Sequence, residues 1–235
     1  MGNDADEIRN WWSTSIIDMS PGKISFRGNE IENLIGNISF PQMIWMMVRG
    51  GLPTNEEASL FEAALVAGVD HGPQAPSIAA ARMAATCGVG INNAMATGIN
   101  MLGDIHGGAG EQCAELFYEI SLRIDNGATF EKAIQEALRE WESGNGKIIS
   151  GFGHRFHKPI DPRAPRLLEL VRLAAKENIV SGKYADIAEA IQSHLSIKKD
   201  IAMNLDGATA VIFCELGFPA PLSRGLFCLS RSVGI

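Results

Sequence analysis

Apolar residues return at intervals of three or four positions along most of the chain from about residue 29 onward, which is the spacing of an amphipathic helix. One such segment follows Thr54, which stands three residues before Glu57 in the arrangement of a capping box and predicts a helix start. Another segment opens at Thr129 and is expected to stop at Gly144 and Gly146. The pattern therefore predicts a chain built mainly of helices.

Further segments extend this prediction to most of the chain. Asn29 is expected to cap a helix, and Asp161-Pro162 supplies an N-cap and a first-turn proline for another. A third helix is expected over residues 184–195. The stretch 76–103 is rich in Ala, Gly, Met and Ile and carries almost no charge beyond Arg82, so it predicts helices that are packed on all sides.

Strand signals are confined to a short stretch near the start of the chain. Ile16 and Ile17 precede a Pro21-Gly22 turn, and Ile24 and Phe26 follow it. Two short apolar runs on either side of such a turn are typical of a β-hairpin. We therefore predict an all-α fold with a small N-terminal β-hairpin.

The composition is that of an ordinary globular protein, with 46% hydrophobic and 20% charged residues in a chain of 235. A net charge of −7 would be repelled by nucleic acid and by an anionic membrane surface, so neither is expected as a general partner. The sequence lacks both an apolar run near the ~18 residues of a membrane span and a secretory signal. We expect a cytoplasmic protein that meets anionic ligands with local clusters of Arg and Lys.

The four cysteines are widely spaced and form no CxxC pair, so we expect reduced residues of the core rather than disulfides or a metal site. They are Cys87, Cys113, Cys214 and Cys228.

The stretch Gly151–Ala164 concentrates cationic side chains on a loop that leads into a predicted helix start. Its cations and potential cations are His154, Arg155, Lys158 and Arg163. Backbone amides and the helix dipole also favour anions at such a place, so the stretch predicts a local anion site. It is not a dinucleotide fingerprint, because no strand precedes it and the third glycine is absent.

The order of residues in this stretch, Gly-Phe-Gly-His-Arg-x-x-Lys-x-x-Asp-Pro-Arg-Ala, resembles the signature of the citrate synthase superfamily. Other landmarks of that superfamily follow in the expected order over essentially the whole chain. They are Arg27-Gly28 with Glu32-Asn33-Leu34, Gly51-Leu52-Pro53-Thr54, Asp70-His71-Gly72, Asp104 to Ala109, Asn204-Leu205-Asp206-Gly207, and Phe227 to Gly234. The resemblance implies a two-domain helical enzyme that acts on an acyl-CoA thioester.

Two departures from the pattern of full citrate synthases bear on the reaction. The chain is much shorter, and the segment usually found between the Thr54 helix and the Asp-His element is absent. In this it is similar to citryl-CoA lyases and to the C-terminal lyase module of ATP-citrate lyase. That module carries Phe where this chain has His106, which is the synthase-like residue.

The resemblance implies a role for each site residue. Asp206 is expected to be the base for the α-proton of the thioester, while His106 donates to the thioester oxygen as a neutral imidazole. His154 is expected to donate to the ketone oxygen of an oxaloacetate-like partner and, in the cleavage direction, to remove the tertiary hydroxyl proton. The expected carboxylate ligands are His71, Arg163 and Arg231. The expected coenzyme A contacts are Gly151, Phe152, Gly153, Arg155 and Lys158.

The compressed chain, which is similar to citryl-CoA lyases, implies a carbon–carbon lyase that cleaves citryl-CoA, or a close analogue, to acetyl-CoA and oxaloacetate through a thioester enolate. Two alternatives stay open: a citrate or 2-methylcitrate synthase that condenses an acyl-CoA with a 2-keto acid, and a non-catalytic CoA-binding subunit. The coenzyme A thioester is a substrate. No nucleotide redox cofactor is expected, and no metal either, because the histidines never stand at i, i+4 with a Glu. His157 and His194 are assigned ordinary surface or core roles.

The resemblance also implies a domain organisation. Residues 109–215 are expected to form a small helical domain. Residues 1–108, completed by 216–235, are expected to form a large dimerisation domain, with the catalytic cleft between the two and a homodimer as the assembly. Because the chain ends at Ile235 inside an apolar pattern, a further C-terminal segment is expected.

Overall fold

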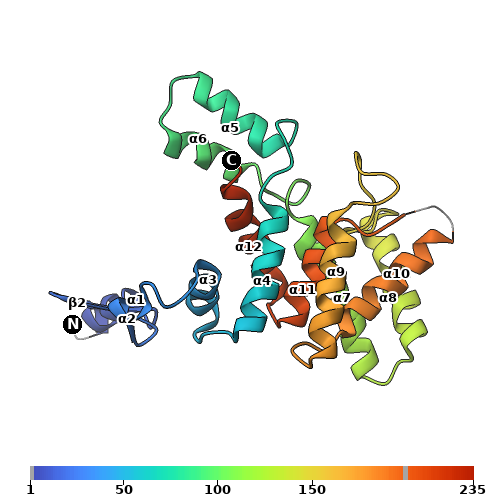
Figure 1. The fold of residues 1–235 in the computed structure, drawn as a ribbon, viewed down its shortest axis with the longest axis horizontal. Helices are drawn as coiled ribbons and strands as arrows, with labels where there is room; N and C mark the ends of the chain where they lie inside the picture. Colours follow the sequence, from blue (N-terminus) through green and yellow to red (C-terminus); the bar gives the residue numbers. More distant parts are fainter. Residues whose placement is uncertain (1–2, 198–200) are drawn as a thin grey trace. The chain divides into compact units, whose positions relative to one another are not determined.

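The structure is a computed structural model that describes residues 3–197 and 201–235. Helices dominate it (Figure 1). The helices are α1 Asn3–Trp11, α2 Ile31–Leu34, α3 Phe40–Arg49, α4 Asn55–Gly68, α5 Pro76–Thr86, α6 Ile91–Asn100, α7 Ala109–Asp125, α8 Phe130–Asn145, α9 Arg163–Lys176, α10 Lys183–Ser196, α11 Leu205–Glu215 and α12 Ala220–Ser232. The strands are β1 Ile17–Ser20, β2 Lys23–Phe26 and β3 Asn29–Glu30. The predicted fold class is confirmed. Among the described residues, no helix is both long enough and apolar enough to cross a membrane.

The chain divides into two compact units, Met1–Ser59 and Leu60–Ile235. Every predicted site residue lies in the second unit. The predicted domains, 109–215 and the remainder, differ from this division, which rests on compactness in one conformation. That division therefore stays a prediction.

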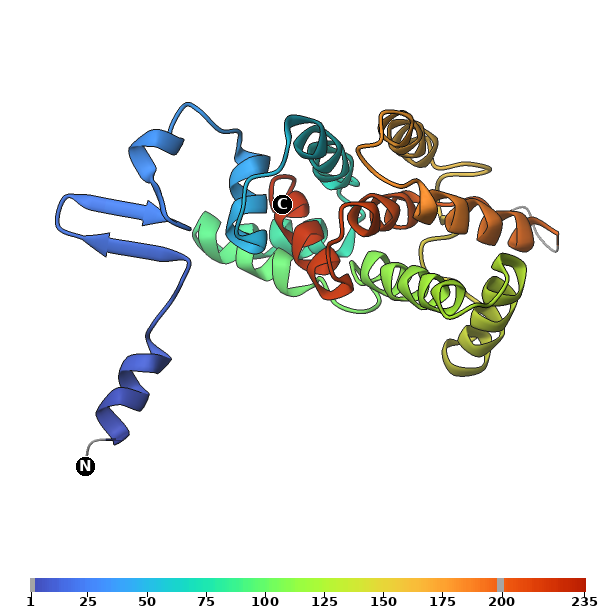
Figure 2. The same cartoon turned by 90° about the horizontal axis from the view of Figure 1, so that it is seen from below.

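The strands of the first unit form an antiparallel sheet in the order β1-β2-β3. Ile17 of β1 lies opposite Phe26 of β2, which confirms the predicted hairpin, and Figure 2 shows these two strands side by side. The third strand was not predicted. It arises because Arg27 and Gly28 both have positive φ, 49° and 82°, as in a tight two-residue hairpin turn. The predicted helix cap at Asn29 is wrong, because Asn29 pairs with Phe26 in the sheet.

Two predicted helix starts are confirmed by their capping bonds. The Thr54 amide donates to the Glu57 carboxylate over 2.8 Å, and the Glu57 amide donates to the Thr54 hydroxyl over 3.2 Å. At the start of α8, the Thr129 hydroxyl accepts a hydrogen bond from the Lys132 amide. This helix ends at Asn145, directly before Gly146, whose φ of 83° breaks the helical conformation.

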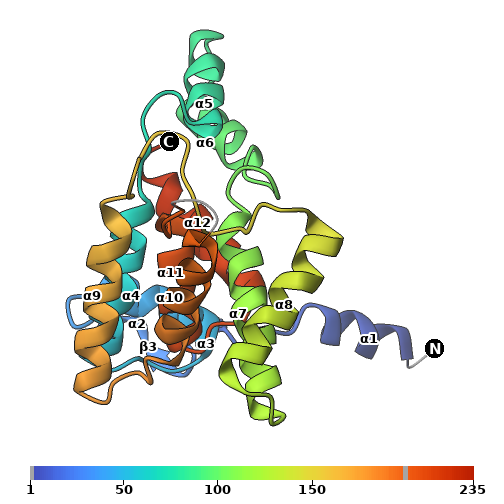
Figure 3. The same ribbon diagram turned by 90° about the vertical axis from the view of Figure 1, so that its right-hand side faces the viewer.

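Helix α11 lies at the centre of the second unit. Its residues from Gly207 to Cys214 are all buried, and it packs against α7, α9, α10 and α12. Figure 3 shows α10 and α11 between α9 and α7. A helix that is apolar on every face is stable only when neighbours cover all of it. Because Asp206 lies in the first turn of α11, the core of the unit fixes its position.

Helices α5 and α6 pack against each other, and α6 also contacts α12. The prediction that this stretch is packed on all sides is wrong for the single chain. Met83 and Ile91 are 67% and 80% exposed, because these contacts cover only part of each helix.

The four cysteines are free thiols, as predicted. Cys113 and Cys214 belong to the core, whereas Cys228 is half-buried and Cys87 is exposed. The prediction of a core position is therefore wrong for Cys87, which follows the last residue of α5.

Candidate active site

His106 lies on the loop between α6 and α7, and one backbone amide determines its tautomer. The Ser77 amide donates to His106 Nε2 over 3.2 Å, and the Ser77 hydroxyl lies 3.0 Å from the same atom. An amide can only donate, so Nε2 carries no proton and Nδ1–H is the free donor. Burial, and secondarily Arg231, lower the pKa of His106. The ring is therefore a neutral hydrogen-bond donor, as the proposed contact with a thioester oxygen requires.

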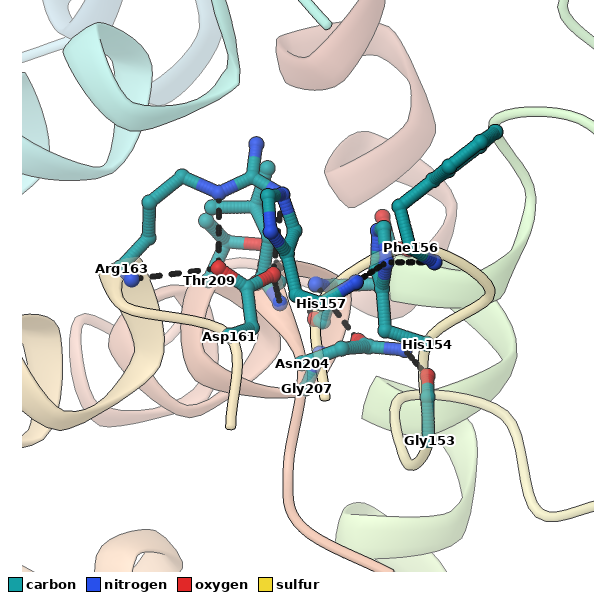
Figure 4. A network of polar contacts seen from close by, with 11 residues as sticks. Gly153, His154, Phe156, His157, Asp161, Arg163, Asn204, Gly207 and Thr209 are labelled. Atoms are coloured by element: carbon teal, nitrogen blue, oxygen red, sulfur yellow. Dashed lines mark hydrogen bonds and ion pairs between the residues drawn. The ribbon is translucent and has the colours of Figure 1, made fainter. Parts of the chain in front are cut away.

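His154 has the opposite tautomer. The amides of Phe156 and His157 both donate to its Nδ1, each over 3.0 Å (Figure 4). Nε2 of the neutral ring therefore carries the proton. Burial, followed by the nearby His157, lowers the pKa of His154 although Asp161 opposes the shift. This arrangement suits donation to a substrate oxygen, but it leaves the ring without a lone pair for the hydroxyl proton.

Asp206 is held at the start of α11 by Asn204. The Asn204 side-chain oxygen accepts from the amides of Asp206 and Gly207, over 2.9 and 3.2 Å, while its side-chain nitrogen donates to the Gly153 carbonyl over 2.6 Å. Asn204 thus joins the loop that carries His154 to the helix that carries Asp206. Burial raises the pKa of the Asp206 carboxyl, and Arg231 and Arg163 oppose the shift.

The same loop touches α11 through two glycines. A Cβ at Gly207 would overlap the Gly151 carbonyl oxygen and lie 2.7 Å from Met203 Cγ. A Cβ at Gly151, where φ is +87°, would lie 2.5 Å from Cys113 Sγ. Only glycine permits this approach. The distance between His154 and Asp206 therefore depends on direct backbone packing.

Asp161 holds Arg163 and the first residue of α11 together. Its fully buried carboxylate accepts from Arg163 Nε and Nη2, each over 2.9 Å, from the Arg163 amide, and from the Leu205 amide over 3.1 Å (Figure 4). Burial alone would raise the pKa of Asp161, but the hydrogen bonds from Arg163 and Leu205 lower it. Arg163 is thus oriented by Asp161 next to the residue that precedes Asp206.

Replacing Asp161 with Asn is expected to lower the free energy of unfolding by ~2–4 kcal/mol, because Arg163 loses its buried carboxylate partner. Chemical denaturation at pH 7 measures this. The folded pKa of Asp161 lies below the unfolded value of about 3.9, so the stabilisation is complete above that pH. It disappears as the pH falls through the folded pKa, and the Asn variant should lack this acid-dependent part.

Asp125→Asn is a matched control for Asp161→Asn. Asp125 pairs with Lys183 over 3.1 Å, but its side chain is 60% exposed. Its replacement should change the stability by no more than ~0.5 kcal/mol. Equal effects of the two substitutions would contradict the anchoring role of Asp161.

Arg231 is a buried cation in the last turn of α12. Its Nε donates to the Gly68 carbonyl over 2.8 Å, and the guanidinium stacks 4.7 Å from the centre of the Phe227 ring. No described residue accepts a hydrogen bond from its two Nη atoms. Burial lowers the pKa of Arg231, against the effect of Asp206 and Asp70. Arg231 also acts electrostatically on His71 and His106 and contributes to the lowered pKa of each ring.

His71 faces the loop of His154 from the segment after α4. The Asp70 carboxylate accepts from the amides of His71 and Gly72, over 2.7 and 3.0 Å, and fixes this turn. The ring centre of His71 lies 5.0 Å from that of His154. Burial lowers the pKa of His71, and Arg163 is the next largest cause. A neutral ring in the positive field of two arginines is suited to a substrate carboxylate.

His157 is a site residue that the sequence reasoning missed. One ring nitrogen from each of His71, His154 and His157 lies within 4.8 Å of the other two. Three imidazoles at such distances can hold a metal ion, but a zinc-bound histidine normally donates its other ring N–H to an acceptor. His154 Nδ1 faces two amide donors instead. The chemistry of this residue therefore favours a substrate oxygen over a metal. The sequence signal that could have identified it is its position three residues after His154, on the same loop.

The residues predicted to bind coenzyme A are only partly brought together. Gly153 and Lys158 line a cavity of about 590 Å³ together with His154 and His157. Phe152 is buried and pairs with Met203. The other two residues are an exposed Arg155 and Gly151, which packs on α11 as described above. The geometry thus favours Gly153 and Lys158 as ligand contacts.

Most of the chain resembles proteins of a known family. Residues 54–235 match the protein family described as Citrate synthase, C-terminal domain. The chain belongs to the citrate synthase family. A citrate synthase of Saccharolobus solfataricus is 31% identical over 188 residues, which are 77% of this chain and 47% of that protein. This citrate synthase family chain thus spans about half the length of the curated relatives it matches.

Two solved structures extend the comparison. The citryl-CoA lyase of Hydrogenobacter thermophilus has 32% identity and a TM-score of 0.82, over 95% of this chain and 83% of the lyase. The ATP citrate lyase of Methanothrix soehngenii, solved with citrate and coenzyme A, has 21% identity and a TM-score of 0.79, over 100% of this chain and 40% of that chain. The second likeness shows a shared fold. This member of the citrate synthase family therefore has the citryl-CoA lyase as a neighbour that it matches over most of both chains.

Proposed function

We propose that the chain cleaves citryl-CoA, or a close analogue, to acetyl-CoA and oxaloacetate. The observation that carries this proposal is the match to a citryl-CoA lyase over most of both chains, whereas the citrate synthases are matched over about half of their length. The fixed tautomers of His106 and His154 support it, because each neutral ring keeps one N–H that can donate to a substrate oxygen.

In this reaction the three catalytic residues act on different atoms. His154 Nε2–H hydrogen-bonds to the oxygen at the carbon that becomes the ketone, and His106 Nδ1–H to the thioester oxygen that becomes an enolate. When the carbon–carbon bond breaks, Asp206 delivers a proton to the enolate carbon. Burial raises the pKa of Asp206, which favours the protonated form that this step consumes.

Arg163, Arg231 and His71 hold the carboxylates of the substrate in this proposal. Arg163 keeps its orientation through Asp161, and Arg231 through the Gly68 carbonyl. Guanidinium groups held in this way are suited to planar carboxylates. Lys158 and the Gly153 backbone line the cavity that we assign to coenzyme A, and the exposed Arg155 is available for its phosphates.

A second candidate is the condensation of an acyl-CoA with a 2-keto acid, followed by hydrolysis. It is favoured by the curated relatives, which are named citrate synthases, and by His106. The third, a non-catalytic CoA-binding subunit, does not explain why both imidazoles are aimed as donors by backbone amides.

Incubation with citryl-CoA should release acetyl-CoA and oxaloacetate. Chromatography of the thioesters measures the acetyl-CoA, and reduction of oxaloacetate by NADH and malate dehydrogenase measures the oxaloacetate. A parallel reaction of acetyl-CoA with oxaloacetate should yield little free coenzyme A. Rapid release of free coenzyme A together with citrate would favour the synthase instead. The reaction should survive EDTA, because none of its proposed steps uses a metal.

We also propose that the chain forms a homodimer through α5 and α6. Their uncharged outward residues, among them Met83 and Ile91, are exposed in the single chain. Burial of such residues is the usual source of stability in an obligate interface.

A further inference from the structure

His157 lies beside two residues of the proposed site but has no role in the reaction so far. Its ring centre is 4.5 Å from that of His154 and 5.5 Å from that of His71, and Figure 4 shows the rings of His154 and His157 next to each other. One nitrogen of each of the three rings lies within 4.8 Å of the others. Any three such points share a point within about 2.8 Å of each, a hydrogen-bond distance. A substrate oxygen at that point would lie within hydrogen-bond distance of one nitrogen of each ring.

The three rings offer this oxygen different groups. His154 Nδ1 is occupied by two amides, so His154 offers only Nε2–H. Among residues 3–197 and 201–235, nothing forms a hydrogen bond with the rings of His71 or His157. Each of these two rings, when neutral, retains one lone pair that can accept a proton. Cleavage of a tertiary alcohol requires such an acceptor, because the hydroxyl must lose its proton as the ketone forms.

His71 is the less suitable acceptor of the two. Arg163 and Arg231 both act on it electrostatically and disfavour a further positive charge there. The positive field of these two arginines matches the carboxylate-binding role already proposed for it. His157 belongs instead to the wall of the cavity that Gly153 and Lys158 line, on the same loop as His154.

We propose that His157 is a further catalytic residue, the acceptor of the tertiary hydroxyl proton during cleavage. This inference rests on the proposed function. The O–H bond breaks and its proton bonds to the free ring nitrogen of His157, while the O–H electron pair forms the carbonyl of oxaloacetate. The electron pair of the breaking carbon–carbon bond becomes the enolate of acetyl-CoA, which Asp206 protonates at carbon. The proton on His157 returns to Asp206 through solvent before the next turnover.

The variant His157→Gln tests this role. It keeps a polar side chain of similar reach and leaves the backbone amide that orients His154, but an amide side chain does not accept a proton. The kcat for cleavage of citryl-CoA should fall by about 100-fold or more, with KM within about threefold of the wild type. The rate at which the acetyl-CoA methyl protons exchange with D₂O, measured by NMR, should stay within about threefold of the wild-type rate. This exchange needs Asp206 and His106, but no hydroxyl proton. (S)-malate, which cannot condense, fills the carboxylate sites during this measurement.

His194→Gln is the matched control, because His194 lies near the end of α10 outside the site and should behave as the wild type in both assays. An unchanged kcat in His157→Gln overturns this inference but leaves the proposed function standing. A parallel loss of cleavage and exchange also overturns it, because His157 would then organise the site rather than accept the proton. Tight Zn²⁺ binding that disappears in His157→Gln, with cleavage that EDTA abolishes, overturns it in favour of a metal. A wild type that neither cleaves citryl-CoA nor condenses its products removes the proposed function and this inference together.

Discussion

Replacing Asp206 with Asn should lower kcat for citryl-CoA cleavage by about 10³-fold or more, while the Kd of coenzyme A changes by no more than about twofold. The amide has the shape of the carboxylic acid but cannot give a proton to the enolate carbon, and such proton transfers contribute ~10²–10⁴-fold. The position of the side chain should be retained, because the Asn204 cap binds backbone amides of the first turn. Steady-state kinetics and calorimetric titration with coenzyme A measure the two effects.

Asp186→Asn provides a matched control for this substitution. Asp186 also lies in the first turn of a helix, α10, but its side chain is 59% exposed and pairs with Arg172. Its replacement should leave kcat unchanged. If Asp206→Asn kept more than a tenth of the wild-type kcat, the proton would have to come from another group.

Gly207→Ala is expected to impair both stability and catalysis, although it adds a single methyl group. The new Cβ would overlap the Gly151 carbonyl oxygen and approach Met203 Cγ to 2.7 Å. Overpacking of this kind costs ~1–3 kcal/mol. The loop has to move away from α11, and it carries His154. Because a misplacement of ~1 Å can cost about 100-fold in rate, we expect kcat to fall by about that factor. Thermal unfolding should shift down by about 2–4 °C for each kcal/mol lost.

Gly225→Ala separates this contact from the general effect of Ala in a helix. Gly225 lies inside α12, and a Cβ there would meet nothing within 4 Å. The change should stabilise the protein by ~0.5–1 kcal/mol, because Ala favours the helical conformation. A Gly207→Ala variant that gained stability in the same way would contradict the close packing of α11 on the loop.

Local rules predicted much of this fold. The capping pair Thr54 and Glu57 set a helix start without help from distant residues. The failures have equally local causes. The turn at Arg27 and Gly28 required positive φ at a residue that seldom adopts it, so a third strand was not expected.

The site was predictable to the extent that its residues stand in a recognisable order. His106, His154 and Asp206 fall in three landmarks of one family, far apart in sequence, and Asn204 joins the loop of His154 to the helix of Asp206. Their tautomers were not predictable, because they depend on amides such as that of Ser77, whose side chain carries no signal. His157 was missed because the signature leaves its position open.

The backbone hydrogen bonds of His106 and His154, the two imidazoles proposed as catalytic, also limit how this member of the family responds to acid. A proton that adds to His106 must displace the Ser77 amide from Nε2, and one that adds to His154 must displace two amides from Nδ1. Protonation of either ring is thus opposed by the backbone hydrogen bonds that the ring accepts. Any loss of rate on mild acidification should therefore come from the protonation of other groups. Acid strong enough to protonate these two rings should break the backbone hydrogen bonds and loosen the two loops that carry them.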